Sequence, residues 1–415
     1  MKNSAIGAFE ILEIPETGWT TLRDDAKYAI LCSMNIKTNN GAHAVHVVRC
    51  ANYGESLAPA FARLLEESHL LSESAARGRK VLVKPNLLTD RTPDKAVTTH
   101  PELLRLVIRH LKSVGAIVSV GDSPASAANL KNVLERTGVG DVCRDEDVPF
   151  VSFEQAGACK REANGFQFTI ARSVVEADLI VSMPKVKSHS LTKLTAAVKN
   201  LYGAVPGYCK TTLHRLHPRP DDFGRLLKAI WCVLPQTISI ADAVVGMEGQ
   251  GPANGCPAKL GFIAASADPF ALDIALCEML HIRSNTVPYL AGEAKTHAPE
   301  LSGDKIEIAS FDVPVGSHLI GLVPTRLAKM AASVLWVRPR IDDALCIGCG
   351  KCAKACPAEA LVMQPGGRRK AGPSPTLDRR RCVGCACCHE VCPKGAIKMV
   401  PSPLLRLFHA FHGID

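Results

Sequence analysis

Two cysteine runs with the same spacing constrain this chain of 415 residues more than any other feature. The first run is Cys346-x2-Cys349-x2-Cys352-x3-Cys356, and a proline follows it. The second run repeats the spacing, again before a proline, at Cys382, Cys385, Cys388 and Cys392. Three thiolates at intervals of three residues hold three corners of one cubane, and the fourth cysteine reaches the other cluster. The spacing therefore predicts two [4Fe–4S] clusters.

The spacing also predicts how the cysteines are shared. One cluster is expected on Cys346, Cys349, Cys352 and Cys392, and the other on Cys382, Cys385, Cys388 and Cys356. Structural zinc sites usually pair two CxxC or CxxH knuckles across a longer insert, which fits this pattern poorly. The CxxxCxxC signature of S-adenosylmethionine radical chemistry is absent. Clusters held by four thiolates carry electrons and leave no iron open to substrate, and Cys387 is expected to be a bystander beside them.

Composition places the rest of the chain among ordinary globular proteins. It is 47% hydrophobic and 21% charged, and at ~150 residues per domain its length predicts roughly two to three domains. We find no apolar run of the ~18 residues that a membrane-spanning helix needs, and no signal peptide near the start. Cysteines clustered at one end favour metal ligation in a reducing compartment, so we expect a cytoplasmic protein. Of the net charge of +9, the last 78 residues carry +7, which argues against nucleic-acid binding by the whole chain.

Short apolar segments alternate with helical ones from about residue 43. Strands are expected at 45–50, 81–83, 116–120, 166–170, 179–182, 238–241 and 260–264, and helices at 57–71, 101–114, 126–136 and 224–234. This alternation predicts an α/β fold with a mostly parallel sheet and helices on both faces. A small ferredoxin-type α+β domain is expected at the C-terminus.

We divide the chain accordingly. The expected units are an N-terminal extension (1–42), an α/β domain (43–318), a linker helix (319–340), a two-cluster domain (341–400) and a tail (401–415). The linker helix, centred on 324–337, is expected to pack between the two domains. Because Arg326, Lys329 and Arg338 flank its apolar face, peripheral contact with a membrane stays open as an alternative.

Polar side chains follow four of the expected strands, at the edge where open α/β sheets bind ligands. Lys84 and Asn86 follow the first, Asp122 the second, the stretch from Lys185 through Lys187 to His189 the third, and Asp242 the fourth. Lys199 and Asn200 come soon after the third group. Lysines beside glycine N–H groups form anion sites. We therefore expect one crevice that binds a small anionic substrate or cofactor.

We assign roles within this crevice as hypotheses. Lys84, Asn86, Lys199 and Asn200 are expected to bind the anion, while Lys185, Lys187, His189, Asp122 and Asp242 are expected to take part in the chemistry. His189 and His214 fit acid–base work, metal ligation or plain packing. Asp122 fits a helix cap equally well. P-loop, GxGxxG, HExxH and GxSxG signatures are all absent, so NTPase, zinc protease and serine hydrolase functions lack support.

These residues carry a family resemblance. The stretches Lys84-Pro-Asn86, Gly-Asp122-Ser-Pro, Met-Pro-Lys185-x-Lys187-x-His189 and Val-Lys199-Asn200-Leu-x-Gly resemble the domain-of-unknown-function 362 family. Asp242 followed by Gly-x-Gly-Pro252 fits the same pattern. Residues 341–400 resemble a bacterial two-cluster ferredoxin, and the joined form resembles the uncharacterised Fe–S centre proteins. The resemblance implies an α/β domain coupled to electron-transfer clusters and supplies no substrate.

We expect an iron–sulfur oxidoreductase that carries electrons through two [4Fe–4S] clusters to or from the bound anion. The alternative is a non-enzymatic electron relay whose α/β domain recognises a partner protein; a third is a hydrolase or transferase with structural clusters. The insert between the cysteine runs holds six cations, namely Arg368, Arg369, Lys370, Arg379, Arg380 and Arg381. These would steer an acidic, flavodoxin- or ferredoxin-like redox partner, or form a solvated loop.

Overall fold

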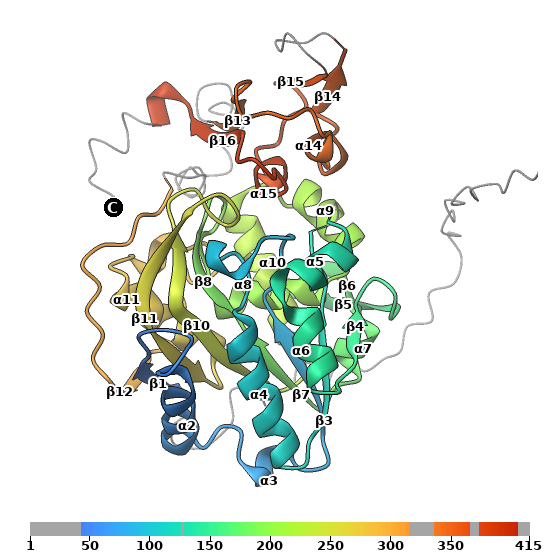
Figure 1. The fold of residues 1–415 in the computed structure, drawn as a ribbon. Coiled ribbons are helices and arrows are strands. Elements are labelled where there is room, and N and C mark those ends of the chain that lie inside the picture. Colours follow the sequence, from blue (N-terminus) through green and yellow to red (C-terminus); the bar gives the residue numbers. More distant parts are fainter. Residues whose placement is uncertain (1–42, 126–127, 315–335, 366–372, 406–415) are drawn as a thin grey trace, which may run out of the picture.

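A ten-stranded mixed sheet forms the centre of the molecule. The computed structural model describes residues 43–125, 128–314, 336–365 and 373–405. The strands run in the order β12-β1-β11-β10-β7-β2-β3-β4; off this path, β8 pairs with β10 and β9 pairs with β8 (Figure 1). They are β1 (Ala44–Arg49), β2 (Lys80–Pro85), β3 (Ile117–Asp122), β4 (Phe150–Ser152), β7 (Leu179–Met183), β8 (Lys185–His189), β9 (Lys193–Thr195), β10 (Thr237–Glu248), β11 (Cys256–Ser266) and β12 (Glu300–Gly303).

The central strands are parallel, as the sequence predicts. β10, β7, β2, β3 and β4 pair in parallel with their neighbours, whereas β11 runs antiparallel to both β10 and β1. Only residues 249–255 separate β10 from β11. A parallel return needs a crossover of a dozen or more residues, so this short connection allows only an antiparallel pair. The strand expected at 166–170 forms as β6 (Phe166–Ala171), but it pairs with β5 (Ala158–Ala163) in a separate hairpin.

Helices cover both faces of the sheet, which confirms the predicted fold class. Along β2, Leu82 belongs to one hydrophobic core, while Val81 and Val83 belong to the other, because successive side chains point to opposite faces. The described helices of four or more residues in this part are α2 (Leu57–Ser68), α3 (Glu73–Ala76), α4 (Pro101–Ser113), α5 (Leu130–Thr137), α6 (Val139–Asp145), α7 (Arg172–Val175), α8 (Ala197–Leu201), α9 (Gly207–Leu216), α10 (Pro220–Cys232) and α11 (Pro269–Met279). Residues of α2 and α4 pack into one core, and those of α10 and α11 into the other.

Helix α4 illustrates how the sequence sets these elements. Pro101 occupies its first turn, and the His100 side chain accepts a hydrogen bond from the Glu102 N–H at the N-cap. Its apolar residues recur at helical spacing and are all buried, namely Leu103, Leu104, Val107, Ile108 and Leu111. Gly115 follows with a φ of 82°, a left-handed conformation that ends helices readily.

The two-cluster domain has its own small sheets. Its elements are β13 (Val337–Ile341), α14 (Lys351–Lys354), β14 (Leu361–Gln364), β15 (Ser374–Leu377), α15 (Cys387–Glu390) and β16 (Ile397–Pro401). β13 pairs antiparallel with β16, and β14 pairs antiparallel with β15. Residues 337–340 therefore lie in strand β13 of this domain and not in the expected linker helix. Residues 319–335 of that helix, the N-terminal extension 1–42 and residues 366–372 of the insert lie outside the described residues.

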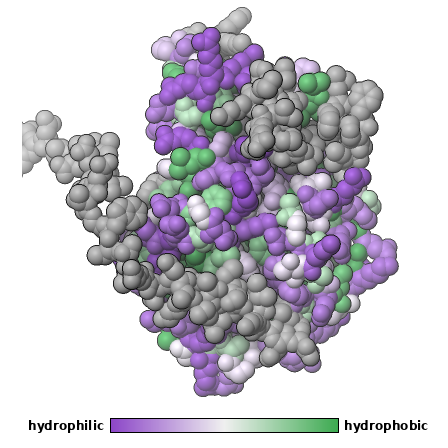
Figure 2. All heavy atoms as spheres, turned by 180° about the vertical axis from the view of Figure 1, so that it is seen from behind, coloured by the Kyte–Doolittle hydropathy of each residue, from purple (hydrophilic) through white to green (hydrophobic). Residues whose placement is uncertain are grey.

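One face of the described part is mostly polar where its residues are seen. Figure 2 shows hydrophilic residues over most of one face, with hydrophobic residues scattered among them. Among the described residues, we find no helix with both the length and the apolar character needed to cross a bilayer.

Candidate functional site

The eight motif cysteines surround two separate cavities. One cavity, cluster site 1, is lined by Cys346, Cys349, Cys352 and Cys392. The other, cluster site 2, is lined by Cys356, Cys382, Cys385 and Cys388. The structure thus groups these thiols in the two sets that the spacing predicts. No pair among the described cysteines forms a disulfide.

The surroundings of both sites fit cubane clusters. Backbone N–H groups of Ala360 and Ala396 donate hydrogen bonds to the sulfurs of Cys356 and Cys392, at 3.2 and 3.3 Å. Such N–H···S bonds stabilise the negative charge of a thiolate-bound cluster and tune its potential. Gly348 and Gly384, with φ of 69° and 71°, let each loop turn tightly between successive ligands. Bound there, each cluster would accept and release single electrons.

Helix α15 joins the two-cluster domain to the α/β domain (Figure 1). One ring nitrogen of His389 lies 3.0 Å from the Gln250 carbonyl oxygen, and Asn254 Nδ2 donates to the His389 carbonyl at 2.7 Å. Arg91 donates to the Cys392 carbonyl at 3.2 Å and to the Asn254 side chain at 3.3 Å. Segments far apart in the chain therefore meet directly beside the cluster ligands.

A cavity of about 100 Å³ lies at this contact, and we call it the junction cavity. The α/β domain contributes most of its wall from the carboxyl ends of β2, β3 and β8 and from α8 and α9. Its charged and polar lining consists of Lys84, Asn86, Asp122, Ser123, Lys187, His189, Thr195, Lys199, Asn200, Tyr202, Lys210, Thr211 and His214. From the two-cluster domain, Cys387 and Glu390 of α15 complete it. The structure therefore brings seven of the nine predicted site residues to one cavity, and the cluster domain contributes to its wall.

Lysines dominate the charge of this cavity. Lys84 Nζ lies 2.7 Å from Asp122 Oδ1, and both side chains are 2% exposed. Lys187, Lys199 and Lys210 pair with no carboxylate among the described residues. Lys187 Nζ donates to the Val97 carbonyl at 2.5 Å, and Lys199 Nζ lies 5.7 Å from the centre of the Tyr202 ring. Buried cations without acidic partners are costly unless an anion joins them.

Burial shifts the pKa of these groups towards their neutral forms. It lowers the pKa of Lys210 to about 8, and together with the Lys199 cation it lowers the pKa of Lys187 well below the usual value. Burial lowers the pKa of His189 to about 3 and that of His214 to about 4. Both imidazoles are therefore neutral near pH 7. Burial alone would raise the pKa of Glu390, but His189 and Lys199 outweigh it and lower this pKa.

Several polar atoms at the cavity lack a partner. Among the described residues, five buried side-chain atoms of its wall make no hydrogen bond, namely Asn86 Oδ1, His189 Nε2, Thr195 Oγ1, His214 Nδ1 and Glu390 Oε1. His189 Nε2 and Glu390 Oε1 lie 3.3 Å apart but are not aligned for a hydrogen bond. Buried polar atoms are nearly always satisfied, so a group of unsatisfied ones at one cavity indicates a place for ligand or water.

Asparagines position two of the lysine-bearing elements. Asn200 Oδ1 accepts from Asn86 Nδ2 at 3.0 Å, and its Nδ2 donates to Ser182 Oγ at 2.9 Å. Gly203 makes the close approach possible, because a Cβ there would lie 2.3 Å from Lys84 Nζ and 2.5 Å from Asp122 Oδ1. The sequence stretch Lys199 to Gly203 thus holds the Lys84–Asp122 pair in place.

Two of the expected chemical residues lie elsewhere. Lys185 Nζ is 2.6 Å from Asp242 Oδ2 and 2.8 Å from the Tyr53 hydroxyl, and neither Lys185 nor Asp242 lines the junction cavity. Parallel strands β8 and β10 place the two residues in register, so they neutralise one another inside the protein. We therefore leave Lys185 and Asp242 out of the candidate site and assign them to the packing of β8 on β10.

Sequence reasoning missed the contribution of α15. Cys387 was expected only as a bystander near a cluster, whereas it also lines the junction cavity. Glu390 was not singled out, although it is the only acidic residue between Cys382 and Cys392. An isolated carboxylate inside a cluster-binding loop was the available signal. Tyr202, which lines the same cavity, carried no distinguishing pattern.

Comparisons with known proteins agree with these two parts of the chain. The profile of the family described as "Domain of unknown function (DUF362)" matches residues 81–278, and that of a 4Fe-4S dicluster domain matches residues 345–396. The chain is 31% identical over 255 residues to the thylakoid-associated protein sll1697 of Synechocystis sp., covering 61% of this chain and 79% of that protein.

Solved structures give weaker likenesses. Lactate racemase apoprotein of Thermoanaerobacterium thermosaccharolyticum aligns with a TM-score of 0.38 and 12% identity, over 59% of this chain and 58% of that one. A crystal structure of a Thermotoga maritima protein aligns with a TM-score of 0.35 and 13% identity, over 55% and 60%. This chain thus spans less than two thirds of either structure. The family match and the curated relative together show that the chain belongs to the DUF362 family, here joined to a C-terminal 4Fe-4S dicluster domain.

Proposed function

We propose that this protein is an oxidoreductase that carries electrons through its two [4Fe–4S] clusters to or from a small anion in the junction cavity. The observation that carries the proposal is the shared wall: α15 provides Cys387 and Glu390 to the cavity and lies between the cluster ligands Cys385 and Cys392. Only the single turn of α15 would separate a molecule bound there from cluster site 2.

Charge and size define the kind of molecule expected. The charges of Lys84 and Asp122 cancel. Burial lowers the pKa of Lys187, Lys199 and Lys210, but an anion bound among them would favour their charged forms, and Glu390 offsets only one of these three charges. The excess positive charge in a buried setting favours a dianion, because charges attract strongly where water is excluded. A water needs roughly 10–15 Å³ of such space, so a cavity of about 100 Å³ holds several waters. A dicarboxylate or a small phosphate therefore fits, and a nucleotide does not.

The remaining groups take specific roles in this proposal. The unpartnered Asn86 Oδ1 would accept a hydrogen bond from a hydroxyl of the anion. His189, neutral and with Nε2 free of hydrogen bonds, would transfer a proton as electrons arrive or leave. Asn200 would hold the asparagine and lysine side chains in position, through its bond to Asn86 and its 3.4 Å contact with Lys84 Nζ.

The proposal predicts that anion binding in the junction cavity changes the surroundings of a cluster. In dithionite-reduced protein, sulfate or succinate is expected to change the electron paramagnetic resonance signal of one cluster. Lys199→Gln should weaken this binding about tenfold, the loss expected for one charge-assisted hydrogen bond. Lys131→Gln is the matched control, because Lys131 is exposed on α5, away from the cavity, and it should bind as the unmodified protein does.

Reoxidation provides the second readout of the same test. The low-molecular-weight fraction of a cell extract should reoxidise the reduced protein faster than it reoxidises Lys199→Gln. If neither anion alters the spectrum and both proteins reoxidise at one rate, the junction cavity is not the electron destination. That result would favour the alternative, an electron relay whose α/β domain recognises a partner protein.

Cluster site 1 provides the proposed contact with a redox partner protein. Cys349 is exposed, and the adjacent Leu345 and Ile347 are 46% and 51% exposed. Lys394 lines the same site, so an apolar patch with one basic residue lies at cluster site 1. Such a patch suits an acidic, flavodoxin- or ferredoxin-like carrier.

Salt tests this docking proposal. Reduction of the clusters by a reduced flavodoxin should slow markedly as ionic strength rises, since screening weakens the attraction between opposite charges. Reduction by dithionite, a small reagent that needs no docking surface, is the control. A flavodoxin rate that salt leaves unchanged contradicts the proposed partner. We place this exchange in the cytoplasm, where thiols stay reduced.

A further inference from the structure

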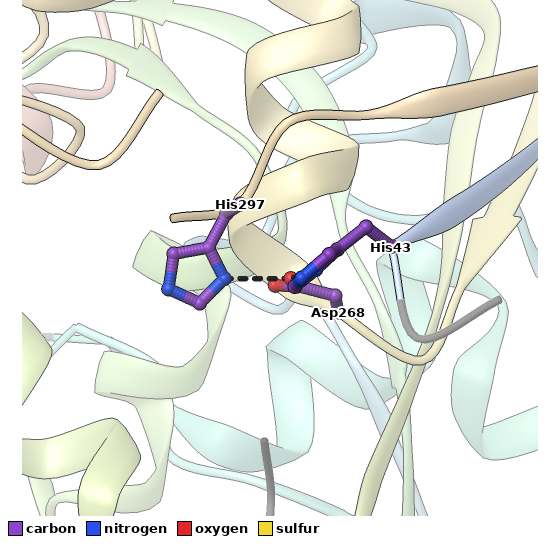
Figure 3. A group of neighbouring side chains, drawn as sticks. All are labelled: His43, Asp268 and His297. Carbon is purple, nitrogen blue, oxygen red and sulfur yellow. Dashed lines mark hydrogen bonds and ion pairs between the residues drawn. The ribbon is translucent and has the colours of Figure 1, made fainter. Parts of the chain in front are cut away.

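We propose that His43, Asp268 and His297 bind a zinc ion at the end of the sheet opposite the junction cavity. Nδ1 of each imidazole lies 2.6 Å from the same oxygen, Asp268 Oδ2. All three potential ligand atoms lie within 4.8 Å of one another. Figure 3 shows the two rings approaching one carboxylate from different directions. Two imidazoles and one carboxylate are a ligand set that zinc accepts in proteins.

Strand topology explains why three distant residues meet. His43 immediately precedes β1, Asp268 follows the end of β11, and His297 precedes β12. β11 is antiparallel to β1, whereas β12 is parallel to it, so these three strand ends share one edge. The order β12-β1-β11 makes the strands immediate neighbours. A bound ion would hold the ends of these three strands together, including that of the short outer strand β12.

Outer contacts orient two of the ligands as metal sites require. Asp268 Oδ1 accepts from the N–H groups of Phe270 and Ala271 at 2.8 and 3.2 Å, which turns Oδ2 towards the histidines. His297 Nε2 lies 3.6 Å from Glu293 Oε2. A ligating histidine usually has its second nitrogen near a carboxylate, which fixes the tautomer and raises its basicity. This arrangement leaves Nδ1 of His297 as the ligand atom.

The burial of the group suits a three-ligand site with one open position. The side chains of Asp268 and His297 are 8% and 5% exposed, while that of His43 is 27% exposed. The Phe270 ring stacks on His297 with the ring centres 4.7 Å apart and holds it in place. His43 is the most exposed of the three side chains, so a water from its side would complete a tetrahedral shell.

Zinc binding requires a small rearrangement with a measurable signature. At 2.6 Å the nitrogen–oxygen contacts are hydrogen bonds. Zinc bonds of 2.0–2.1 Å in a tetrahedron separate the ligand atoms by about 3.3 Å, so the carboxylate must withdraw slightly. The proton on each Nδ1 must also move to Nε2, so that the Nδ1 lone pair faces the metal.

Zinc titration of the anaerobic protein with both clusters in place tests the site. We expect one zinc ion per chain, with the iron content unchanged at about eight atoms per chain for two cubanes. His43→Ala should bind zinc at least about tenfold more weakly. His46→Ala is the matched control. It removes a histidine of the adjoining strand β1 whose ring contacts Ser302 and not the triad, so this variant should bind zinc normally.

X-ray absorption at the zinc edge distinguishes this site from zinc in the cysteine loops. The triad gives only nitrogen and oxygen neighbours near 2.0–2.1 Å, whereas a cysteine site gives sulfur near 2.3 Å. A sulfur shell, or equal zinc affinity in His43→Ala and the unmodified protein, overturns the proposal. Since His43 lies at the surface end of the group, its loss should leave the chain folded, which circular dichroism verifies.

Discussion

Cys388→Ala is expected to remove the cluster of cluster site 2 and, with it, electron exchange at the junction cavity. Cys388 is almost completely buried, 7% exposed, and is one of four thiols around that site. A cubane without its fourth thiolate loses iron readily, so the iron content should fall to roughly half. Reoxidation by the low-molecular-weight fraction should then drop to the rate seen without it. Iron analysis and paramagnetic resonance measure the two effects.

The neighbouring thiol provides the control for this substitution. Cys387 lines the junction cavity and does not line either cluster site. Cys387→Ala should therefore keep both clusters and their spectra. If Cys387→Ala loses iron to the same extent as Cys388→Ala, the ligand set assigned to cluster site 2 is wrong.

Asp242→Asn is expected to destabilise the α/β domain by about 3–5 kcal/mol, the loss typical of breaking a buried ion pair from one side. Lys185 and Asp242 are 1% and 0% exposed, and Asp242 also accepts from the Tyr53 hydroxyl at 2.6 Å and the His100 N–H at 2.8 Å. Chemical denaturation followed by circular dichroism measures the free energy of unfolding. Asp94→Asn, in the exposed pair with Lys95, should change it by no more than about 1 kcal/mol.

The size of this loss should depend on pH. Burial lowers the pKa of Lys185 and Asp242 opposes that effect, so the substitution lowers this pKa further. The unfolded chain then binds a proton that the folded chain lacks, and stability rises with pH between the two pKa values. The deficit of Asp242→Asn should therefore shrink from pH 7 towards pH 9. A deficit that grows over this range contradicts an unpaired buried lysine.

Local patterns were sufficient to predict much of this molecule. The cysteine spacing alone predicts which four thiols share each cluster, because a short loop can present only three ligands to one cubane. Apolar stretches ending in Lys84, Asp122 and Lys187 predict residues at one edge, because parallel strands finish together there. The same pattern predicts the mostly parallel sheet.

The remaining features of the site depend on contacts between residues that are far apart in the sequence. Lys185 and Lys187 alternate along β8, and no local pattern says that Lys185 meets Asp242 while Lys187 lines the cavity. Glu390 and His189 lie 201 residues apart in sequence, and only the docking of α15 brings them within 3.3 Å. Such contacts depend on how two domains fit together, and a single sequence carries little signal for that.

The double use of α15 couples cluster insertion to the assembly of the junction cavity. Its four residues, Cys387–Glu390, include a cluster thiol and two side chains of the cavity wall. A chain synthesised during iron shortage would have all the lysines of the junction cavity, but the wall that α15 forms would not be held in place. Cluster insertion and completion of the cavity would then occur together. An oxidant that destroys the cluster of cluster site 2 would reverse both.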